Sequence, residues 1–265
     1  MTRLGIAAPL HWLRRAIGTA ADGLTDLAFP PVCSFCDTDL GEAPVDKRLC
    51  PACSTAIVGE PVYRCTRCAA AVAPTFIGNE CPWCGERHYR FKRTVAIGRY
   101  HGPLRDAVLR LKHPGSEPLA AAIAEGLWRH AGDTLRAERI DLVVPVPMHW
   151  LRRIRRGWNS PELIATALAR RLSVDAGVKV RDYPRLLVRL RNTKPQAGLS
   201  QTERATNVHR AFGLRRRYRV EGATVLVVDD VMTTGATCSE AARTLLEAGA
   251  KRVVVGVLAR AQGET

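Results

Sequence analysis

The chain has 265 residues, of which 46% are apolar and 25% are charged. This composition is typical of a globular protein and excludes a disordered or fibrous chain. No uncharged run approaches the roughly 20 residues that a membrane-spanning helix needs, and the first apolar stretch, GIAAPL, is too short for a secretory signal. We therefore expect a cytoplasmic protein, with attachment to the inner membrane surface as the alternative.

Most of the positive charge lies in one internal block. The formal net charge of the chain is +15, and residues 150–220 contain 18 Lys and Arg residues but only four acidic residues. Residues 1–95, in contrast, contain 11 Lys and Arg residues and nine acidic residues. A localised basic block concentrates polyanions such as nucleic acid or phosphorylated metabolites. The block therefore predicts anion binding. The alternative is that these arginines only lie on a solvent-exposed surface.

The first predicted element is an amphipathic helix within residues 1–30. Its apolar positions recur every three to four residues, charged residues lie between them, and two prolines end the pattern. The simplest interpretation is a helix that packs on its own domain, and a membrane-surface anchor or a partner-binding helix is the alternative. The apolar positions are Leu13, Ile17, Ala20, Leu24 and Leu27.

Four C-x-x-C pairs follow within residues 31–88, separated by 13, 11 and 12 residues. The reducing cytosol argues against a disulfide framework, and two C-x-x-C turns together complete a tetrahedral zinc site. The loops between the pairs contain too few apolar residues for a core of their own. We therefore expect two structural zinc ions that supply much of the folding free energy of this module. The eight ligands are Cys33, Cys36, Cys50, Cys53, Cys65, Cys68, Cys81 and Cys84.

Two arrangements of these ligands are consistent with the spacing. In a sequential double ribbon, the first and second pairs share one zinc ion, and the third and fourth pairs share the other. In a cross-braced module, the first pair joins the third and the second pair joins the fourth. The short loops favour the sequential arrangement, because each loop suits a hairpin that returns on itself.

Strands and helices alternate through residues 89–265. Ser160 is expected to cap one of the helices, with Pro161 at its first position. Alternation with apolar strands predicts an α/β fold, in which helices cover both faces of a mainly parallel sheet. The predicted strands are 94–100, 141–147, 185–190, 223–230 and 251–260, and the predicted helices are 102–115, 118–131, 160–172, 200–212 and 239–250.

The most distinctive segment is VLVVDDVMTTGAT, residues 225–237. An apolar strand delivers Asp229 and Asp230 to the carboxyl edge of the sheet, where ligands of such folds bind. A loop with threonines and Gly235 then leads into a helix, and backbone N–H groups at a helix N-terminus bind phosphate. Two adjacent carboxylates are costly unless hydroxyls or a cation meet them. A ribose with a 5′-phosphate would offer its diol to the acidic pair and its phosphate to the loop.

A second strand end carries a cluster of arginines. Residues 141–159 read DLVVPVPMHWLRRIRRGWN, so four arginines follow the proline-rich exit of a buried strand within five positions. Arginine binds phosphate oxygens bidentately, and this segment is therefore a second candidate anion site. A basic turn on a solvated surface is the alternative.

Residues 225–237 resemble the phosphoribosyl-diphosphate (PRPP) signature of type I phosphoribosyltransferases. The resemblance implies that the acidic pair holds the ribose 2′ and 3′ hydroxyls, that residues 233–237 surround the 5′-phosphate, and that Mg²⁺ bridges the ribose hydroxyls and the diphosphate. Related transferases place their diphosphate loop where the arginine cluster stands. Purine-salvage members have an acidic residue at the position of Thr233, which this chain lacks. The implied PRPP residues are Asp229, Asp230, Val231, Met232, Thr233, Thr234, Gly235, Ala236 and Thr237.

Nearly the whole chain resembles the ComF family, which joins an N-terminal double zinc ribbon to a phosphoribosyltransferase-like domain. The resemblance rests on the segments LTDLAFPPVCSFC, YHGPLRDAVLRLKHPG, VVPVPMHWLRRIRRGWN, RNTKPQAGLSQTERATNVHRAF and VLVVDDVMTTGAT. The family usually reads Arg-Gly-Phe-Asn-Gln where this chain has Trp158 for the Phe and Ser160 for the Gln. Three parts are implied, namely a helical lead-in over 1–30, a double zinc ribbon over 31–88 and a phosphoribosyltransferase-like domain over 89–265.

The resemblance implies a role in natural transformation, or in the use of DNA as a nutrient. The protein is then expected to bind PRPP and to handle single-stranded DNA, with a competence helicase as a candidate partner. The alternative is an active phosphoribosyltransferase with an unidentified acceptor, for which the sequence shows no catalytic base. A zinc-ribbon adaptor with a disused pocket is a third interpretation, and the intact acidic pair argues against it. The residues expected at the diphosphate or at nucleic acid are Lys112, Arg152, Arg153, Arg155, Arg156, Asn159 and Arg204.

Overall fold

The computed structural model describes most of the chain beyond residue 30. The helix expected within residues 1–30 lies outside the described residues. Among the described residues, no helix is both long enough and apolar enough to span a membrane. The described ranges are 31–41, 48–59, 63–76, 81–85, 87–157, 159–177, 179–193, 200–215 and 217–262.

A five-stranded parallel sheet forms the centre of the protein, in the order β1-β7-β6-β2-β3. Its inner strands are runs of apolar and β-branched residues, which pack well when both faces of a sheet are buried. The run from residue 225 to residue 228 in β6, for example, is completely buried. The predicted parallel sheet is therefore confirmed. The strands are β1 (Arg93–Arg99), β2 (Leu142–Pro145), β3 (Arg181–Asp182), β6 (Thr224–Met232) and β7 (Arg252–Arg260).

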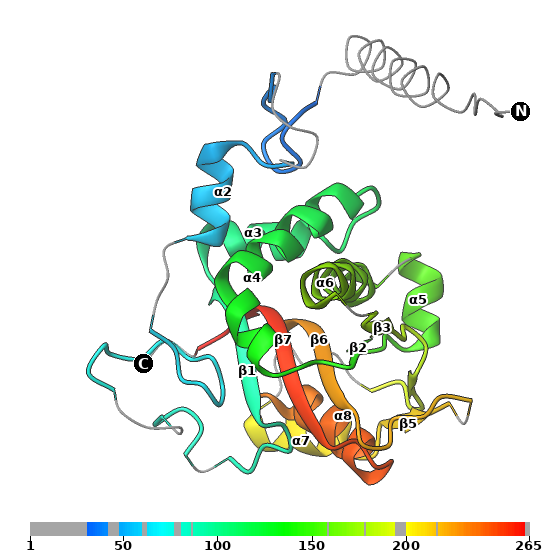
Figure 1. The fold of residues 1–265 in the computed structure, drawn as a ribbon. Helices are drawn as coiled ribbons and strands as arrows, with labels where there is room; N and C mark the ends of the chain where they lie inside the picture. The colour runs from blue at the N-terminus through cyan, green and yellow to red at the C-terminus, as the bar shows by residue number, and fades with distance from the viewer. Residues whose placement is uncertain are drawn as a thin grey trace, which may run out of the picture.

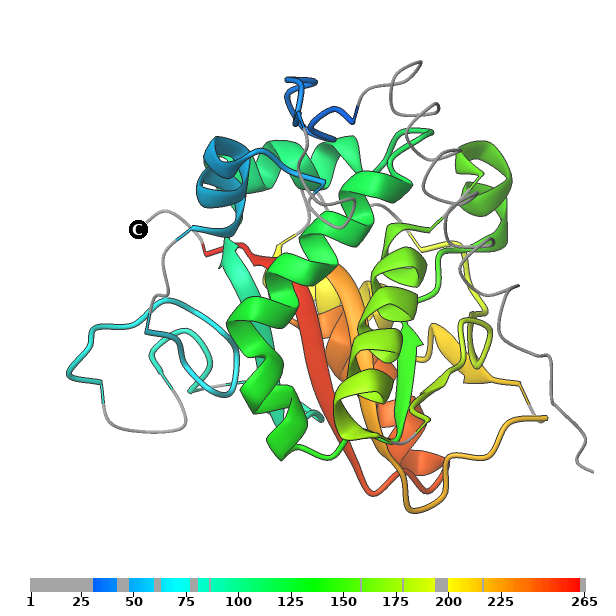
Figure 2. The same ribbon diagram turned by 45° about the horizontal axis from the view of Figure 1, so that its top comes forward.

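Helices cover both faces of the sheet, as the alternating pattern predicts. Helices α4 and α6 pack together on one face, and α8 packs on the other face with α7 beside it (Figure 1). Figure 2 shows α4 and α6 in front of the strands. The buried side of α4 includes Leu119, Ile123 and Leu127, which recur at helical spacing. The helices are α3 (Gly102–Arg110), α4 (Glu117–Ala137), α6 (Ser160–Ala176), α7 (Gln201–Val208) and α8 (Ala236–Glu247).

Some short elements are absent from the sequence prediction. The predicted strand 185–190 contains β4 (Leu187–Arg189), which pairs with β5 (Phe212–Leu214) in a separate antiparallel hairpin. A short helix, α5 (Trp150–Arg156), occupies the arginine cluster. The elements missing from the prediction, α5, β3 and β5, span two to seven residues, which is too short for a recognisable hydrophobic period.

The start of α6 differs from the expectation. Ser160 is the first helical residue, and its neighbour Asn159 occupies the N-cap position without a side-chain cap. The Ser160 hydroxyl instead donates to the Leu111 carbonyl at 2.7 Å. The predicted capping role of Ser160 is therefore wrong, because its hydroxyl ties α6 to the turn after α3. Pro161 lies in the first turn of the helix, one position later than expected.

The cysteine-rich segment lies against the α/β body in two halves. The first half includes α2 (Pro51–Val58), which contacts α3 and α4. The second half runs beside β1, where the Arg64 guanidinium donates to the Ile97 carbonyl at 2.9 Å. In each half, an isolated antiparallel bridge flanks the leading C-x-x-C turn, between Val32 and Asp39 and between Arg64 and Ala71.

Candidate functional site

The acidic pair lies at the carboxyl end of β6. Asp229 and Asp230 are both partly buried, and β6 continues past them to Met232. The Asp230 backbone N–H donates to Asp229 Oδ1 at 2.9 Å, and the Val231 N–H donates to Asp230 Oδ1 at 2.7 Å. Both carboxylates are therefore oriented by the backbone that follows them.

The electrostatic environment of Asp229 disfavours its charged form. Burial, and then the charge of Asp230, raises the pKa of the Asp229 carboxyl well above its usual range, while the positive charge of Arg189 acts in the opposite direction. The Cys238 thiol lies 3.9 Å from Asp229 Oδ2, and burial likewise raises the pKa of this thiol. A ligand that offers hydroxyl groups would relieve this environment, because donated hydrogen bonds favour the carboxylate.

The loop after β6 turns sharply at Gly235. This residue has φ +80, a value that L side chains rarely adopt, and α8 begins at the next residue. The Thr234 hydroxyl accepts from the Ala236 N–H at 3.4 Å. The first N–H groups of a helix have no partner within the helix, so the segment 233–237 presents N–H donors and threonine hydroxyls together. We call residues 232–237 the phosphate loop.

The residues expected at the diphosphate are spread over several elements. Arg153 in α5 pairs with Glu162 at 3.0 Å, and the buried Asn159 donates to the Val146 carbonyl at 3.0 Å. The carbonyl of Leu111 accepts a hydrogen bond from the Ser160 hydroxyl at the start of α6. Lys112, the next residue, therefore lies near Asn159 in the fold. Arg204 lies on α7, which packs against α8. The side chains of Arg152, Arg155 and Arg156 lie outside the described part of the structure.

A pocket of about 390 Å³ opens between the end of β2 and the β4–β5 hairpin. Neither Asp229 nor Asp230 lines it. The pocket lies near them, because the Val146 N–H donates to the Val228 carbonyl at 2.8 Å and the charge of the lining residue Arg189 acts on Asp229. Its size is that of a small-molecule site. Four arginines and no carboxylate contribute to its lining. The lining residues are Pro147, Met148, Trp150, Arg153, Asn159, Pro184, Arg185, Leu187, Val188, Arg189 and Arg215.

Two of the expected anion-site residues, Arg153 and Asn159, therefore share this pocket. Arg185, Arg189 and Arg215 are pocket residues that the sequence analysis did not identify. Their presence depends on how the β4–β5 hairpin folds back over the end of β2, for which the sequence carries no local signal. The basic composition of residues 150–220 is the one feature that points to them.

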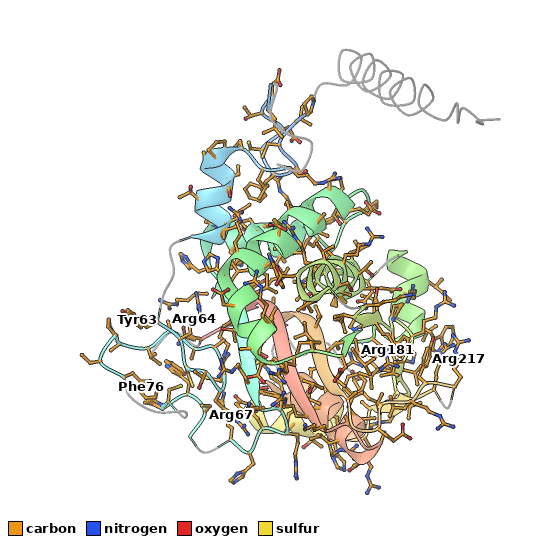
Figure 3. All side chains as sticks on the ribbon, in the orientation of Figure 1. Tyr63, Arg64, Arg67, Phe76, Arg181 and Arg217 are labelled. Atoms are coloured by element: carbon orange, nitrogen blue, oxygen red, sulfur yellow. The ribbon has the colours of Figure 1, made fainter. Side chains whose placement is uncertain are left out.

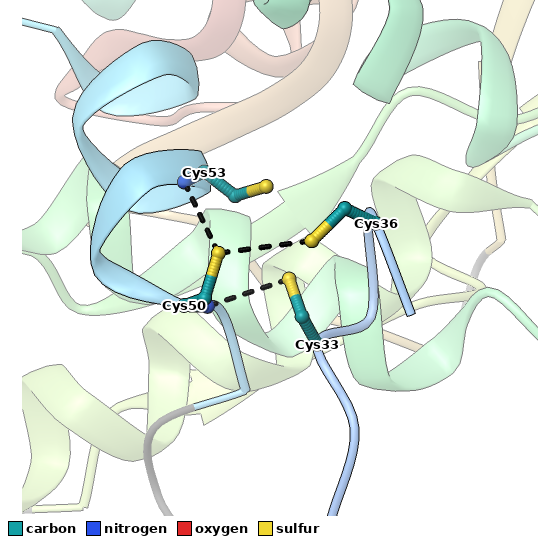
Figure 4. A group of neighbouring side chains, drawn as sticks. All are labelled: Cys33, Cys36, Cys50 and Cys53. Atoms are coloured by element: carbon teal, nitrogen blue, oxygen red, sulfur yellow. Dashed lines mark hydrogen bonds between the residues drawn. The ribbon is translucent and has the colours of Figure 1, made fainter. Parts of the chain in front are cut away.

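The cysteines gather into two groups of four in chain order. Within each group the four sulfur atoms lie within 4.8 Å of one another. We call Cys33, Cys36, Cys50 and Cys53 the first thiol cluster, and Cys65, Cys68, Cys81 and Cys84 the second thiol cluster. This is the sequential grouping that the short loops favour. Figure 4 shows the first thiol cluster, in which Cys50 is also the N-cap of α2.

The sulfur positions fit a tetrahedral zinc ion. Four thiolates at a Zn–S distance of about 2.3 Å lie about 3.8 Å apart. The Cys36–Cys50 and Cys65–Cys84 sulfur distances are both 3.7 Å, and the Cys68–Cys81 distance is 3.6 Å. Backbone N–H groups also point at the sulfurs, as with the Cys50 N–H at 3.3 Å from Cys33 Sγ. The donor set is all thiolate and closed, which is typical of a structural zinc site.

Comparison with known proteins agrees with this architecture. A family model described as "Phosphoribosyl transferase domain" matches residues 162–265, which include β6, the phosphate loop and α8. The chain is 31% identical over 237 residues to DNA utilization protein YhgH of Salmonella typhimurium, a match that covers 88% of this chain and 99% of that protein. It is 29% identical over 217 residues to Competence protein F of Haemophilus influenzae, covering 80% and 90% respectively. It is 23% identical over 230 residues to Competence protein ComFC of Bacillus subtilis, covering 82% and 90%.

Proposed function

The chain belongs to the ComF family, and on this premise we propose that it binds PRPP at the carboxyl end of β6 and handles single-stranded DNA in DNA uptake or use. Its phosphoribosyltransferase-like fold and its two thiol clusters agree with the fold expected from the sequence. Relatives that span most of the chain are named for competence and for DNA utilization. The observation that carries the PRPP proposal is the acidic pair beside the turn at Gly235.

Each half of this site has a defined role in the proposal. Asp229 and Asp230 accept hydrogen bonds from the ribose hydroxyls, which favours their carboxylate forms. The phosphate loop donates backbone N–H and hydroxyl groups to the 5′-phosphate. Mg²⁺, when bound with PRPP, would neutralise diphosphate charge.

The pocket beside the acidic pair supports the DNA-handling half of the proposal. Its four arginines attract phosphate, and Trp150, whose exposed fraction is 60%, offers a surface on which a base can stack. Lys112, Arg152, Arg155, Arg156 and Arg204 belong to the proposed anion-binding set on sequence grounds. A competence helicase as partner is part of the same proposal and rests on the family resemblance of the sequence alone.

The remaining proposals concern metal and location. Two zinc ions would occupy the two thiol clusters, in a double ribbon over residues 31–88 that precedes the phosphoribosyltransferase-like domain over 89–265. A reducing compartment keeps such thiols free to bind zinc, and the proposed location is therefore the cytoplasm, with the inner membrane surface as the alternative. The metal would be structural, because each cluster supplies four protein ligands.

A second candidate function is phosphoribosyl transfer to an acceptor. The observation that favours it is the pocket itself, since a cavity of about 390 Å³ beside the acidic pair has room for an acceptor next to a bound ribose. Catalysis would then depend on positioning and on stabilising the departing diphosphate by the pocket arginines. Among the described pocket residues there is no carboxylate or histidine to serve as a general base.

One titration separates the two functions. A fluorescent single strand is mixed with the protein, with and without PRPP and Mg²⁺, and both anisotropy and released diphosphate are recorded. The DNA-handling proposal predicts saturable binding of the strand that weakens as salt is added, with no diphosphate release. Release of diphosphate that depends on an added acceptor, without strand binding, would favour the transferase.

A further inference from the structure

A buried arginine joins the second thiol cluster to the phosphate loop. Arg260, the last residue of β7, is 1% exposed. Its Nε donates to the Cys68 carbonyl at 3.0 Å, and its Nη1 donates to the Met232 carbonyl at 3.0 Å. The same nitrogen also donates to the Thr233 carbonyl. One guanidinium therefore holds a C-x-x-C turn and the first residues of the phosphate loop at once.

Among the residues that the structure describes, no carboxylate pairs with Arg260. A buried cation is costly unless negative charge compensates it. The sulfurs of the second thiol cluster, all at most 1% exposed, would carry net negative charge when they hold zinc as thiolates. Metal binding at this cluster would therefore supply negative charge near the guanidinium, whose Nε bonds to the carbonyl of the ligand residue Cys68.

A second connection runs through Tyr89. Its hydroxyl donates to the Thr234 carbonyl at 3.0 Å. Its ring lies so close to Gly235 that a Cβ at that position would be 2.6 Å from Tyr89 Cε1. On the other side, the guanidinium of Arg67, a residue within the Cys65–Cys68 turn, donates to the Tyr89 carbonyl at 2.7 Å. The turn, Tyr89 and the loop thus form a continuous chain of contacts.

The C-x-x-C turn is itself fixed to the sheet. The Thr94 hydroxyl on β1 donates to the Arg67 carbonyl at 2.9 Å, and the Thr94 N–H donates to the Thr66 carbonyl at 3.1 Å. Figure 3 labels Arg64 and Arg67 in this segment beside β1. Two hydrogen bonds from Thr94 to backbone carbonyls therefore fix the turn on β1. A shift of the turn would reach the loop through Arg260 and Tyr89.

The first thiol cluster provides a contrast within the same molecule. Its segment bonds to α3 and α4, through Arg110 to the Phe35 carbonyl and through Arg129 to the Ser54 hydroxyl at 3.2 Å. Among the described residues, no hydrogen bond joins this segment to the phosphate loop. The two clusters share a ligand set and differ in their connection to the loop.

We propose that metal at the second thiol cluster and a phosphate ligand in the phosphate loop bind cooperatively, with Arg260 and Tyr89 as the positioning residues that couple them. The proposal deepens the PRPP site and rests on the proposed function for the identity of the ligand. Coupling between two sites is reciprocal, so each ligand must raise the affinity of the other by the same factor. A structural zinc ion would thereby set the affinity of the site for PRPP.

The direct test compares the two clusters in one preparation of the full chain. The zinc-bound protein is exposed to a zinc-selective chelator that leaves Mg²⁺ in solution, and free thiols are pulse-labelled with N-ethylmaleimide and assigned by mass spectrometry. PRPP with Mg²⁺ is expected to slow labelling of the second cluster by about fivefold or more, the lower range of measured couplings. Labelling of the first cluster should not change. Equal slowing of both clusters would indicate general stabilisation and overturn the proposal.

Two variants test whether Tyr89 and Arg260 couple the two sites or only contribute to folding. Tyr89→Phe removes the hydroxyl bond to Thr234 and keeps the ring against Gly235, and its matched control is Tyr63→Phe, in the same segment with an exposed side chain. Arg260→Lys keeps the charge but cannot reach the Cys68 carbonyl and the Met232 and Thr233 carbonyls at once. Tyr89→Phe should reduce the PRPP effect on the second cluster, Arg260→Lys should reduce it further, and Tyr63→Phe should leave it unchanged. Full coupling in both Tyr89→Phe and Arg260→Lys would refute the assignment.

A measurement without PRPP distinguishes failure of this inference from failure of the proposed function. Amide hydrogen exchange of residues 232–239 is compared in protein with both metals and in protein whose second cluster has been emptied. Faster exchange there, without change in α4, supports the coupling even if PRPP does not bind. If PRPP binds the parent protein but neither exchange nor labelling responds, PRPP binding stands and the coupling is wrong.

Discussion

Among single residues, the acidic pair carries the proposed binding of a ribose. Asp229 and Asp230 are adjacent and partly buried, the Cys238 thiol lies 3.9 Å from Asp229 Oδ2, and the charge of Arg189 acts on Asp229. Without a ligand, Asp229 holds its proton more strongly than an exposed carboxyl does, because burial and Asp230 both oppose its charge. The ligand-free fold therefore bears a cost at neutral pH, which hydrogen-bond donors at these carboxylates would reduce.

This cost predicts a pH-dependent effect of Asp229→Asn. The folded state has the higher pKa, so the carboxyl destabilises the fold progressively as pH rises from about 4, the ordinary carboxyl value, toward the raised value. The ligand-free variant should therefore gain melting temperature relative to the parent as the pH is raised. Thermal melts of variant and parent at several pH values measure this. A difference in melting temperature that does not change with pH would refute it.

Gly235 gives a prediction with a control that isolates the contact with Tyr89. Gly235 and Gly222 both have positive φ, but an added Cβ has open space at Gly222 and lies 2.6 Å from Tyr89 Cε1 at Gly235. Gly222→Ala should lose about 1–2 kcal/mol of stability from backbone strain alone and still bind PRPP. Gly235→Ala should lose more stability and weaken PRPP binding. Chemical denaturation and PRPP titration of both variants check this, and equal PRPP affinity in the two would contradict it.

At the scale of elements, the β4–β5 hairpin brings arginines to the pocket at the end of β2. Arg185→Ala with Arg215→Ala should weaken binding of a single strand for all sequences and flatten its salt dependence. Each phosphate contact contributes a slope of roughly −0.7 in log K against log salt, so two contacts account for about −1.4. The matched control is Lys179→Ala with Lys251→Ala, which removes the same charge just before β3 and β7, at the opposite edge of the sheet. Equal losses in the two double variants would mean that net charge, and not the pocket, binds DNA.

The same elements show what the sequence could predict. Long strands such as β6 and long helices such as α4 have enough apolar positions for a clear period, and their predictions are confirmed. The acidic pair and Gly235 lie within seven consecutive residues, 229–235, so one segment is enough to place them at a strand end. Arg189 and Arg260 reach this site from distant segments, and only tertiary packing brings them there. The prediction of Ser160 as a cap is wrong because its hydroxyl donates to the Leu111 carbonyl, 49 positions away in the sequence.

At the scale of the whole molecule, the two thiol clusters join different cores. Cys33 and Cys53 pack with Ile57 and with residues of α4 and α6 on one face of the sheet. Cys65 and Cys68 pack with Phe91 and with residues of α8 on the other face. The clusters therefore brace both layers of the α/β body.

This arrangement predicts that metal removal affects more than residues 31–88. Elemental analysis should find two zinc ions per chain, and strong chelation should unfold the cysteine-rich segment and also lower the melting temperature of the α/β body, because the cores are shared. Calorimetry with and without chelator measures both effects. Fewer than two zinc ions in protein with all thiols intact, or an α/β transition that chelation leaves unchanged, would contradict this account.

Isothermal titration of the zinc-bound full chain with PRPP and Mg²⁺ measures whether the acidic pair and the phosphate loop bind PRPP. The account predicts saturable binding of one PRPP per chain. Asp230→Asn should weaken this binding by about 1–3 kcal/mol, the range for a hydrogen bond to a charged group. No binding by the parent protein, or equal affinity in Asp230→Asn, would contradict the proposed binding.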